Sequence, residues 1–101
     1  MSGINERHSA MEAMLHLSDE HKFQAAMRRD RLLAEWAAQK LGRSDVSVYA
    51  KEVITADLKT PGDQDVCDKV SADLADLGIT AAQVRAQLNA FQAQAVAEAG
   101  R

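Results

Sequence analysis

The fold is decided by the stretch from Phe23 to Leu74, which reads FQAAMRRDRLLAEWAAQKLG at residues 23–42 and YAKEVITADLKTPGDQDVCDKVSADL at residues 49–74. Apolar residues recur every three or four positions through both segments, which is the period of an amphipathic helix. No segment alternates polar and apolar residues for long enough to indicate a strand. The sequence therefore predicts an all-α fold.

The first predicted helix runs from about Ser18 to Leu41. Ser18 offers a side-chain oxygen as the N-cap, and the acidic residues 19–20 suit the positive end of the helix dipole. Gly42 supplies the left-handed conformation in which many helices end. We predict that the inward face of this helix carries its spaced apolar residues, namely Phe23, Met27, Leu33, Trp36, Ala37 and Leu41.

A second helix is predicted to begin at Ser44 or Asp45, either of which can act as its N-cap. It breaks at residues 60–63, Thr-Pro-Gly-Asp, because proline has no amide hydrogen and disfavours helix at the residue before it. The same Thr-Pro pair can equally open the third helix, since proline is favoured at the first helical position. The third helix is predicted to end at Gly78.

The start of the fourth helix carries the strongest local signal in the chain. Residues 80–83, Thr-Ala-Ala-Gln, form a capping box, and Ile79 and Val84 flank it as a hydrophobic staple. Short connections between the helices place successive helices close to antiparallel. The inward residues of the second to fourth helices are predicted to be Val46, Tyr49, Ala50, Val53, Leu58, Val66, Val70, Leu74, Leu77, Val84, Leu88, Phe91 and Ala95.

Together these signals predict a four-helix bundle over residues 18–101, with a long first helix and a mobile N-terminal arm over residues 1–17. The arm holds a loose apolar set among polar residues. Such a segment is either a frayed end or a segment that folds when it binds a partner. In the second case its apolar anchors are Ile4, Met11, Met14, Leu15 and Leu17.

The 101 residues carry a net charge of −3 that is unevenly distributed. Residues 1–43 hold seven Lys and Arg against six Asp and Glu, whereas residues 44–101 hold five against nine. An acidic half argues against binding to nucleic acid, which requires a basic face. The single cysteine, Cys67, excludes an intramolecular disulfide and favours a reducing compartment. With no signal-peptide pattern and no apolar run near the ~20 residues that span a bilayer, we expect a soluble cytosolic protein.

The sequence contains no recognised motif for catalysis or metal binding. The acidic run at residues 63–68 lacks the glycine and glutamate positions of a calcium-binding loop. His16 and His21 are five residues apart and therefore point away from each other on a helix. Cys67 is expected to be a buried and inert thiol. We therefore expect neither an enzyme nor a metal site.

The basic cluster Arg28, Arg29 and Arg31 allows two interpretations. One is a solvated face, on which Arg31 and Glu35 have the spacing of an i,i+4 ion pair. The other is an anion site, because guanidinium groups match the geometry of carboxylates and phosphates. Trp36 is likewise either a core anchor or a stacking surface. The residues alone leave these alternatives open.

Three sequence motifs in this chain have the order and spacing of those in a known family. They are RRDRLLAEWAAQKLG at residues 28–42, YAKEVITAD at residues 49–57 and GDQDVCDKVSAD at residues 62–73. In these three motifs the chain resembles the zeta subunits of alphaproteobacterial F-type ATP synthases. The resemblance implies a four-helix bundle, in agreement with the helical period of the sequence.

The resemblance also implies an inhibitory subunit that binds the catalytic head of the ATP synthase, formed by its alpha, beta and gamma subunits. In this family the arm enters an interface between catalytic and non-catalytic subunits and blocks rotation in the hydrolysis direction while allowing synthesis. A monomer when free is implied, in the cytoplasm and peripheral to the inner membrane through the ATP synthase. The arm residues expected to act are Ile4, Asn5, Glu6, Arg7, Met11, Met14 and Leu15.

Family members also bind ADP or ATP on the bundle, and the resemblance implies that this chain takes either one as a regulatory ligand rather than a required cofactor. The candidate contacts are Arg28, Arg29, Trp36 and Lys40. The family commonly begins with Phe, two acids and Arg, where this chain has Ile-Asn-Glu-Arg at residues 4–7. A second hypothesis is therefore a nucleotide-binding helical bundle of the same family that has lost or weakened inhibition.

Overall fold

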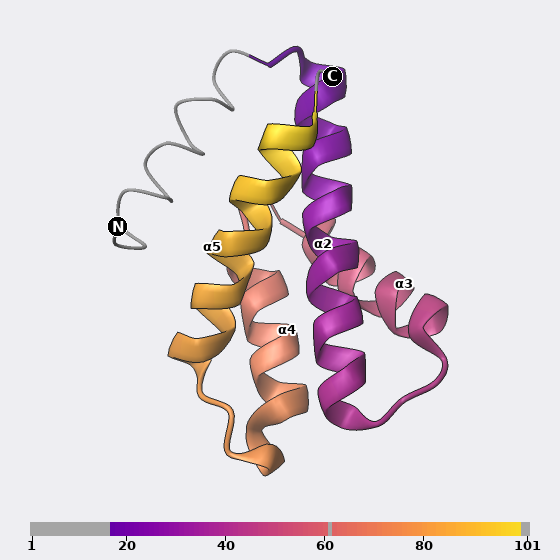
Figure 1. Cartoon of the computed structure of the whole chain (residues 1–101), viewed down its shortest axis with the longest axis vertical. Helices are drawn as coiled ribbons and strands as arrows, with labels where there is room; N and C mark the ends of the chain where they lie inside the picture. The colour runs from indigo at the N-terminus through magenta and orange to yellow at the C-terminus, as the bar shows by residue number, and fades with distance from the viewer. Residues whose placement is uncertain (1–16, 61, 100–101) are drawn as a thin grey trace.

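The computed structural model describes residues 17–60 and 62–99, and within them it confirms the all-α fold. These residues form four α-helices and no strand; the helices are α2 (Asp19–Leu41), α3 (Val46–Asp57), α4 (Gln64–Leu74) and α5 (Ala81–Glu98), and a 3-10 turn, η1 (Ala75–Leu77), follows α4. In Figure 1, α2, α4 and α5 run roughly along the long axis of the molecule, and α3 lies to one side of α2. None of these helices is long and apolar enough to span a bilayer.

Helix α2 begins and ends where its cap residues predict. Ser18 is the N-cap, and its Oγ accepts a hydrogen bond of 3.2 Å from the backbone N–H of His21. Gly42 follows the last turn with a φ of 70°, a left-handed conformation that a residue without a side chain adopts readily. Its N–H donates to the carbonyls of Ala38 and Gln39, which gives two carbonyls at the helix end a partner.

The predicted capping box at the start of α5 is also present. Thr80 Oγ1 accepts a hydrogen bond from the Gln83 N–H at 3.1 Å, and Gln83 Oε1 accepts one from the Thr80 N–H at 2.8 Å. Val84 is fully buried and Ile79 packs against the same core, as a hydrophobic staple requires. Local contacts therefore fix the start of this helix.

The start of α3 and the start of α4 differ from the expected capping. Asp45 occupies the N-cap position of α3, but its carboxylate makes no capping hydrogen bond. It accepts two hydrogen bonds from the Arg43 guanidinium instead, at 2.9 and 2.6 Å. The N-cap of α4 is Asp63, so the alternative in which Thr60 opens the third helix is wrong.

Helix α4 ends at Leu74, whereas the sequence pattern predicts a helix that continues to Gly78. Residues 75–77 tighten into the 3-10 turn, and Gly78 then ends the segment with a φ of 77°. Because a 3-10 turn has only three residues per turn, Leu77 leaves the stripe that contains Val70. Leu77 was predicted to face inward and is 51% exposed.

The core lies where α2 meets the other helices, and it is built largely from small side chains. Ala34, Ala37 and Ala38 of α2 are completely buried, which allows close approach of the neighbouring helices. Tyr49 is the largest fully buried side chain, and Cys67 is a buried free thiol, as predicted. The other buried members are Leu33, Ala50, Val53, Val66, Val70, Leu74, Val84 and Leu88, with Trp36, Leu41, Val46, Ile79 and Phe91 packed against them.

Two further residues that were predicted to face inward are exposed. Phe23 is 58% exposed, because the buried cluster that the described residues form at that end of α2 is small and consists of Ala25, Ala95 and Val96, with Leu17 and Ala99 packed against it. Leu58, the C-cap of α3, is 63% exposed, because it lies on the side of the helix that carries the exposed Lys51, which no described helix covers. Both errors come from extending a helical stripe beyond the packing that supports it.

The capping box predicts a measurable loss of stability. Thr80→Ala removes the oxygen that accepts from the Gln83 N–H, and it should lower the free energy of unfolding by about 1 kcal/mol in urea denaturation. Thr55→Ala is the matched control, because Thr55 is exposed in the interior of α3 and caps no helix. Alanine should leave stability unchanged or slightly raised there. Equal losses in the two variants would contradict the capping role of Thr80.

Candidate functional site

The structure separates the residues predicted to form the site. The inhibitory residues of the arm lie within residues 1–16, outside the described part of the chain. The four predicted nucleotide contacts all lie on α2, where Arg28 and Lys40 are exposed, Trp36 packs against the core and Arg29 is buried. Arg28 and Lys40 are about 18 Å apart along the helix axis. The contacts with ADP or ATP therefore stay a prediction.

Arg29 is the centre of a buried ion-pair cluster. Its Nη2 lies 2.9 Å from Asp30 Oδ1 and 3.0 Å from Asp57 Oδ2. Its Nε donates to Asp30 Oδ1 at 3.0 Å, and its Nη1 donates to Gln92 Oε1 at 3.2 Å. The Arg29 side chain is only 8% exposed, so its guanidinium joins α2 to α3 and α5 in the interior instead of reaching solvent.

Two carboxyl groups share this one guanidinium. Asp30 is completely buried, and its Oδ2 accepts no hydrogen bond from the described residues. Burial raises the pKa of Asp30 well above its ordinary value of 3.8; the neighbouring Asp57 raises it further, while Arg29 opposes the shift. A proton on Asp30 allows it to donate to the Asp57 carboxylate, and it removes one of the two buried negative charges.

Arg28, another residue of the predicted anion site, forms an exposed ion pair instead of a buried one. Its Nε lies 3.2 Å from Glu98 Oε1 on α5, and both side chains are nearly half exposed. Exposed ion pairs of this kind contribute little to stability. The pair borders a small hollow of about 190 Å³, whose other lining residues are Gln24, Ala25, Ala95 and Ala99.

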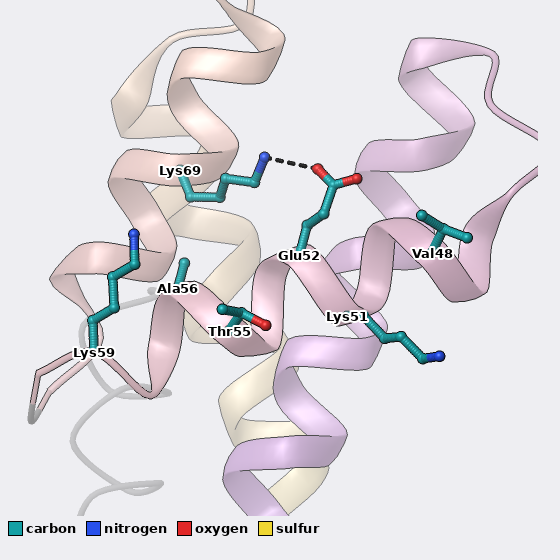
Figure 2. Close-up of a pocket in the computed structure, with 7 residues that line it drawn as sticks. All are labelled: Val48, Lys51, Glu52, Thr55, Ala56, Lys59 and Lys69. Atoms are coloured by element: carbon teal, nitrogen blue, oxygen red, sulfur yellow. Dashed lines mark hydrogen bonds and ion pairs between the residues drawn. The ribbon is translucent and has the colours of Figure 1, made fainter.

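A larger pocket lies on α3 rather than on α2. It measures about 480 Å³ and opens between α3 and α4 (Figure 2). Lys69 is contributed by α4, and its Nζ donates to Glu52 Oε1 at 3.0 Å. The other lining residues are Val48, Lys51, Thr55, Ala56 and Lys59. Three lysines and one glutamate make this pocket net positive. Sequence analysis missed it, although Lys51, Thr55 and Lys59 follow one another at helical i,i+4 spacing.

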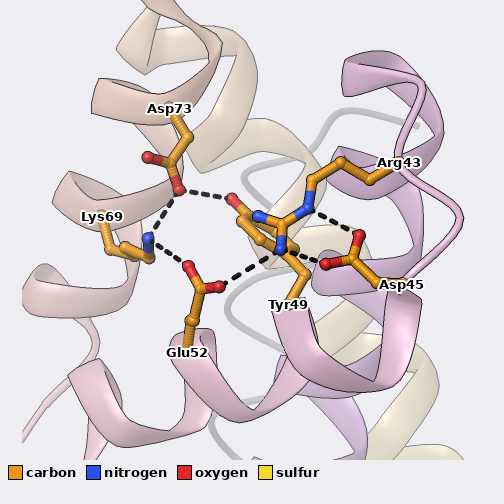
Figure 3. Close-up of polar contacts among 6 residues, drawn as sticks. All are labelled: Arg43, Asp45, Tyr49, Glu52, Lys69 and Asp73. Carbon is orange, nitrogen blue, oxygen red and sulfur yellow. Dashed lines mark hydrogen bonds and ion pairs between the residues drawn. The ribbon is translucent and has the colours of Figure 1, made fainter.

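A polar network beside this pocket joins α3 to α4 and to the connection between α2 and α3 (Figure 3). The Tyr49 hydroxyl donates to Asp73 Oδ2 at 2.8 Å, and Lys69 Nζ lies 2.8 Å from the same oxygen. Glu52 joins Lys69 to Arg43, whose Nη2 is 3.3 Å from the Glu52 carboxylate. The cationic groups of Arg43 and Lys69 lie 4.8 and 5.4 Å from the centre of the Tyr49 ring, within the range of cation–π attraction.

The charges of this network satisfy one another. Burial, together with the hydrogen bond to Asp73, raises the pKa of Tyr49, so the hydroxyl remains a donor. The hydrogen bond from Lys69 is the main cause that lowers the pKa of Glu52, and Arg43 adds to it, so Glu52 stays ionised. We interpret the network as a structural clamp that fixes the orientation of α3.

The acidic run near the start of α4 also binds neighbouring side chains. Asp63 Oδ2 lies 2.8 Å from Arg85 Nη1, and Asp65 accepts a hydrogen bond of 2.7 Å from the Thr60 hydroxyl. Within residues 17–60 and 62–99, no group of three or more His, Cys, Asp or Glu side chains is arranged to hold a metal ion.

Comparison with known proteins gives one match. A family model described as ATPase inhibitor subunit zeta matches residues 1–98 of the chain. No curated protein and no solved structure matches it significantly. The family match agrees with the resemblance seen in the three sequence motifs.

The buried pair of Asp30 and Asp57 predicts a pH dependence of stability. The folded chain retains the Asp30 proton at pH values where an unfolded aspartate has lost it, so unfolding releases a proton. The contribution of Asp30 to stability should be fully present below about pH 4 and should be lost as pH rises towards its raised pKa. This group alone can change the free energy of unfolding by at most about 1.4 kcal/mol per pH unit.

The variant Asp30→Asn tests this assignment, because asparagine keeps the shape of the side chain and does not titrate. Urea unfolding between about pH 5 and about pH 8 should show a weaker pH dependence in this variant than in the wild type. Asp76→Asn is the matched control, because Asp76 is exposed in the 3-10 turn, and it should keep the wild-type slope. An unchanged slope in Asp30→Asn would show that another group titrates.

Proposed function

Because the chain belongs to the ATPase inhibitor subunit zeta family, we propose that it is a regulatory, non-catalytic subunit of a bacterial F-type ATP synthase. The observation that carries the proposal is the extent of the family match. It covers residues 1–98 and so includes the segment ahead of α2 as well as all four described helices. The proposal adds to the family's inhibitory role that this chain binds the catalytic head, formed by the alpha, beta and gamma subunits, and blocks ATP hydrolysis there.

We propose a division of labour between the arm, residues 1–17, and the bundle. The arm enters a cleft between subunits of the head and becomes ordered as it binds. A cleft that exists in only one rotational state of the head selects that state, so the bound arm stops rotation in the hydrolysis direction. The ion pair and hydrogen bond of Arg29, together with the hydrogen bond of Tyr49, support the role of the bundle as a rigid handle, because they join its helices internally.

On this proposal the protein is a monomer when free, acts in the cytoplasm and becomes peripheral to the inner membrane through the ATP synthase. It requires no cofactor, and ADP or ATP acts as a regulatory ligand on the bundle. The exposed cations Arg28 and Lys40 are accessible to a phosphate group. Arg29 would first have to leave Asp30 and Asp57, which makes it the least accessible of the predicted contacts.

The alternative is a nucleotide-binding bundle of the same family that has lost or weakened inhibition. Its support comes from the arm, where Ile4 and Asn5 stand in place of the aromatic and acidic residues common in the family. The two candidates differ in one measurable outcome, which is whether the full-length chain inhibits hydrolysis.

The deciding experiment measures ATP hydrolysis by a purified alphaproteobacterial F-type ATPase with increasing amounts of the full-length chain. Inhibition is expected from the full-length chain and not from a chain that lacks residues 1–17. Circular dichroism and thermal unfolding of both chains control for loss of the bundle fold. Equal inhibition by both chains would contradict the role of the arm, and a full-length chain that does not bind the ATPase would contradict the proposed function.

The double substitution Ile4→Phe with Asn5→Asp separates the two candidates. It restores an aromatic ring and an acid at the start of the arm and should lower the concentration needed for half inhibition. If the wild type binds the ATPase without inhibiting it and this variant inhibits, then the alternative is correct and the defect lies in the arm. Unchanged inhibition in the double variant would show that these two positions do not set potency.

A further inference from the structure

The outward face of α3 has no partner within the described part of the chain. Helix α3 packs on α2 and α4, whereas α5 packs on α2 and α4 from another side (Figure 1), so no other described helix covers one long face of α3. The exposed residues that share this face are Ser47, Val48, Lys51, Thr55, Leu58 and Lys59. We refer to these six residues as the α3 face.

The α3 face exposes two large apolar side chains. Val48 is 52% exposed and Leu58 is 63% exposed, and they lie near the two ends of the helix. They lie ten positions apart along α3 and its C-cap, or about 15 Å. The pocket between α3 and α4 lies along the same surface, with Val48 and Lys59 among its lining residues (Figure 2). Two exposed apolar side chains on one face, beside a hollow, can contact apolar side chains of an amphipathic partner segment.

The α3 face is also basic, although the chain as a whole has a net charge of −3. It carries Lys51 and Lys59 and no acidic residue, and neither lysine forms an ion pair with the described residues. The only carboxylate in the neighbouring pocket is that of Glu52, which Lys69 and Arg43 neutralise. The local charge is therefore positive, and it stays unpaired within the described bundle.

We propose that the α3 face docks an acidic, amphipathic segment of a partner protein, and, resting on the proposed function, that this segment belongs to the catalytic head of the ATP synthase. Apolar residues of the segment cover Val48 and Leu58, and its carboxylates pair with Lys51 and Lys59. The face therefore offers apolar contacts near its two ends and charged groups at Lys51, between them, and at Lys59. The clamp between Tyr49 and Asp73 fixes the orientation of the helix that presents the face.

A second contact through the bundle gives the arm a physical advantage. An arm that becomes ordered on binding loses conformational entropy, which weakens its own affinity. When the bundle is already docked, binding of the arm becomes intramolecular and the effective concentration of the arm rises. The bundle is then a binding module as well as a handle.

The test measures binding of the full-length chain to the purified catalytic head by biolayer interferometry. The charge-reversal variant Lys51→Glu with Lys59→Glu should weaken binding at least about tenfold at low ionic strength, and the loss should shrink as salt is raised. Val48→Ser with Leu58→Ser should weaken binding at all salt concentrations. The matched control is Lys22→Glu with Arg31→Glu, which makes the same change in charge at solvent-accessible positions of α2 outside the predicted nucleotide contacts and should bind like the wild type. Circular dichroism confirms the fold of each variant.

Equal losses in the α3 variant and the α2 control, or no loss in either, would overturn the proposal while leaving the proposed function intact. If the wild type does not bind the head, the proposed function fails, and the α3 face is judged by a second measurement. Titration of the labelled chain with an acidic amphipathic peptide should shift amide signals of residues 47–59. Absent shifts, or shifts centred elsewhere, would overturn the proposal. Stronger binding to phosphatidylserine vesicles than to either protein probe would assign the face to a membrane and would also overturn it.

Discussion

Arg29 on α2 binds Asp57 at the end of α3 and Gln92 on α5 through one guanidinium group. The adjacent residue, Asp30, also pairs with this guanidinium. The positions of α3 and α5 around α2 depend on this contact. A buried charge that loses its partner is left uncompensated, which typically costs about 3–5 kcal/mol. The arginine and its two carboxyl groups therefore form a unit in which loss of the Arg29 charge would leave Asp57 without its buried partner.

The small side chains of the core explain why such polar contacts matter here. Ala34, Ala37 and Ala38 allow the helices to approach closely, but each buries little apolar area and contributes little free energy. A bundle of this size has no large aromatic core to compensate, since Tyr49 is its largest fully buried side chain. The hydroxyl of Tyr49 also donates to Asp73 at the part-buried edge of the core, so a hydrogen bond holds the largest core side chain in place.

The sequence predicts local features well because their causes are local. The caps at Ser18 and Thr80 depend on residues within one turn, and both are present in the structure. The inward positions of Phe23 and Leu58 were predicted wrongly, because the period of a helix gives a direction but not the extent of its neighbours. Arg29 was interpreted from its charge as a candidate anion contact. It lies four residues from the buried Ala25 and Leu33, so the helical period was the available signal that its side chain is buried.

The candidate site shows the same division between local and tertiary causes. Family membership could be predicted because each of the three sequence motifs is an unbroken segment of the chain, and the family match confirms it. The pocket on α3 depends on Lys69, which α4 brings alongside, and no spacing within α3 reveals that neighbour. The predicted contacts with nucleotide and with the catalytic head remain predictions, because they concern partners that lie outside this chain.

The cap at Ser18 has a mechanical consequence. Since α2 starts at the next residue, a pull on the segment ahead of it is delivered directly to the first turn of a helix of 23 residues. That helix contacts α3, α4 and α5, so a force on it is distributed over three helix–helix contacts as shear and does not detach a single helix. On the proposed function the protein has to withstand torque, and α2 would carry that load along one continuous helix.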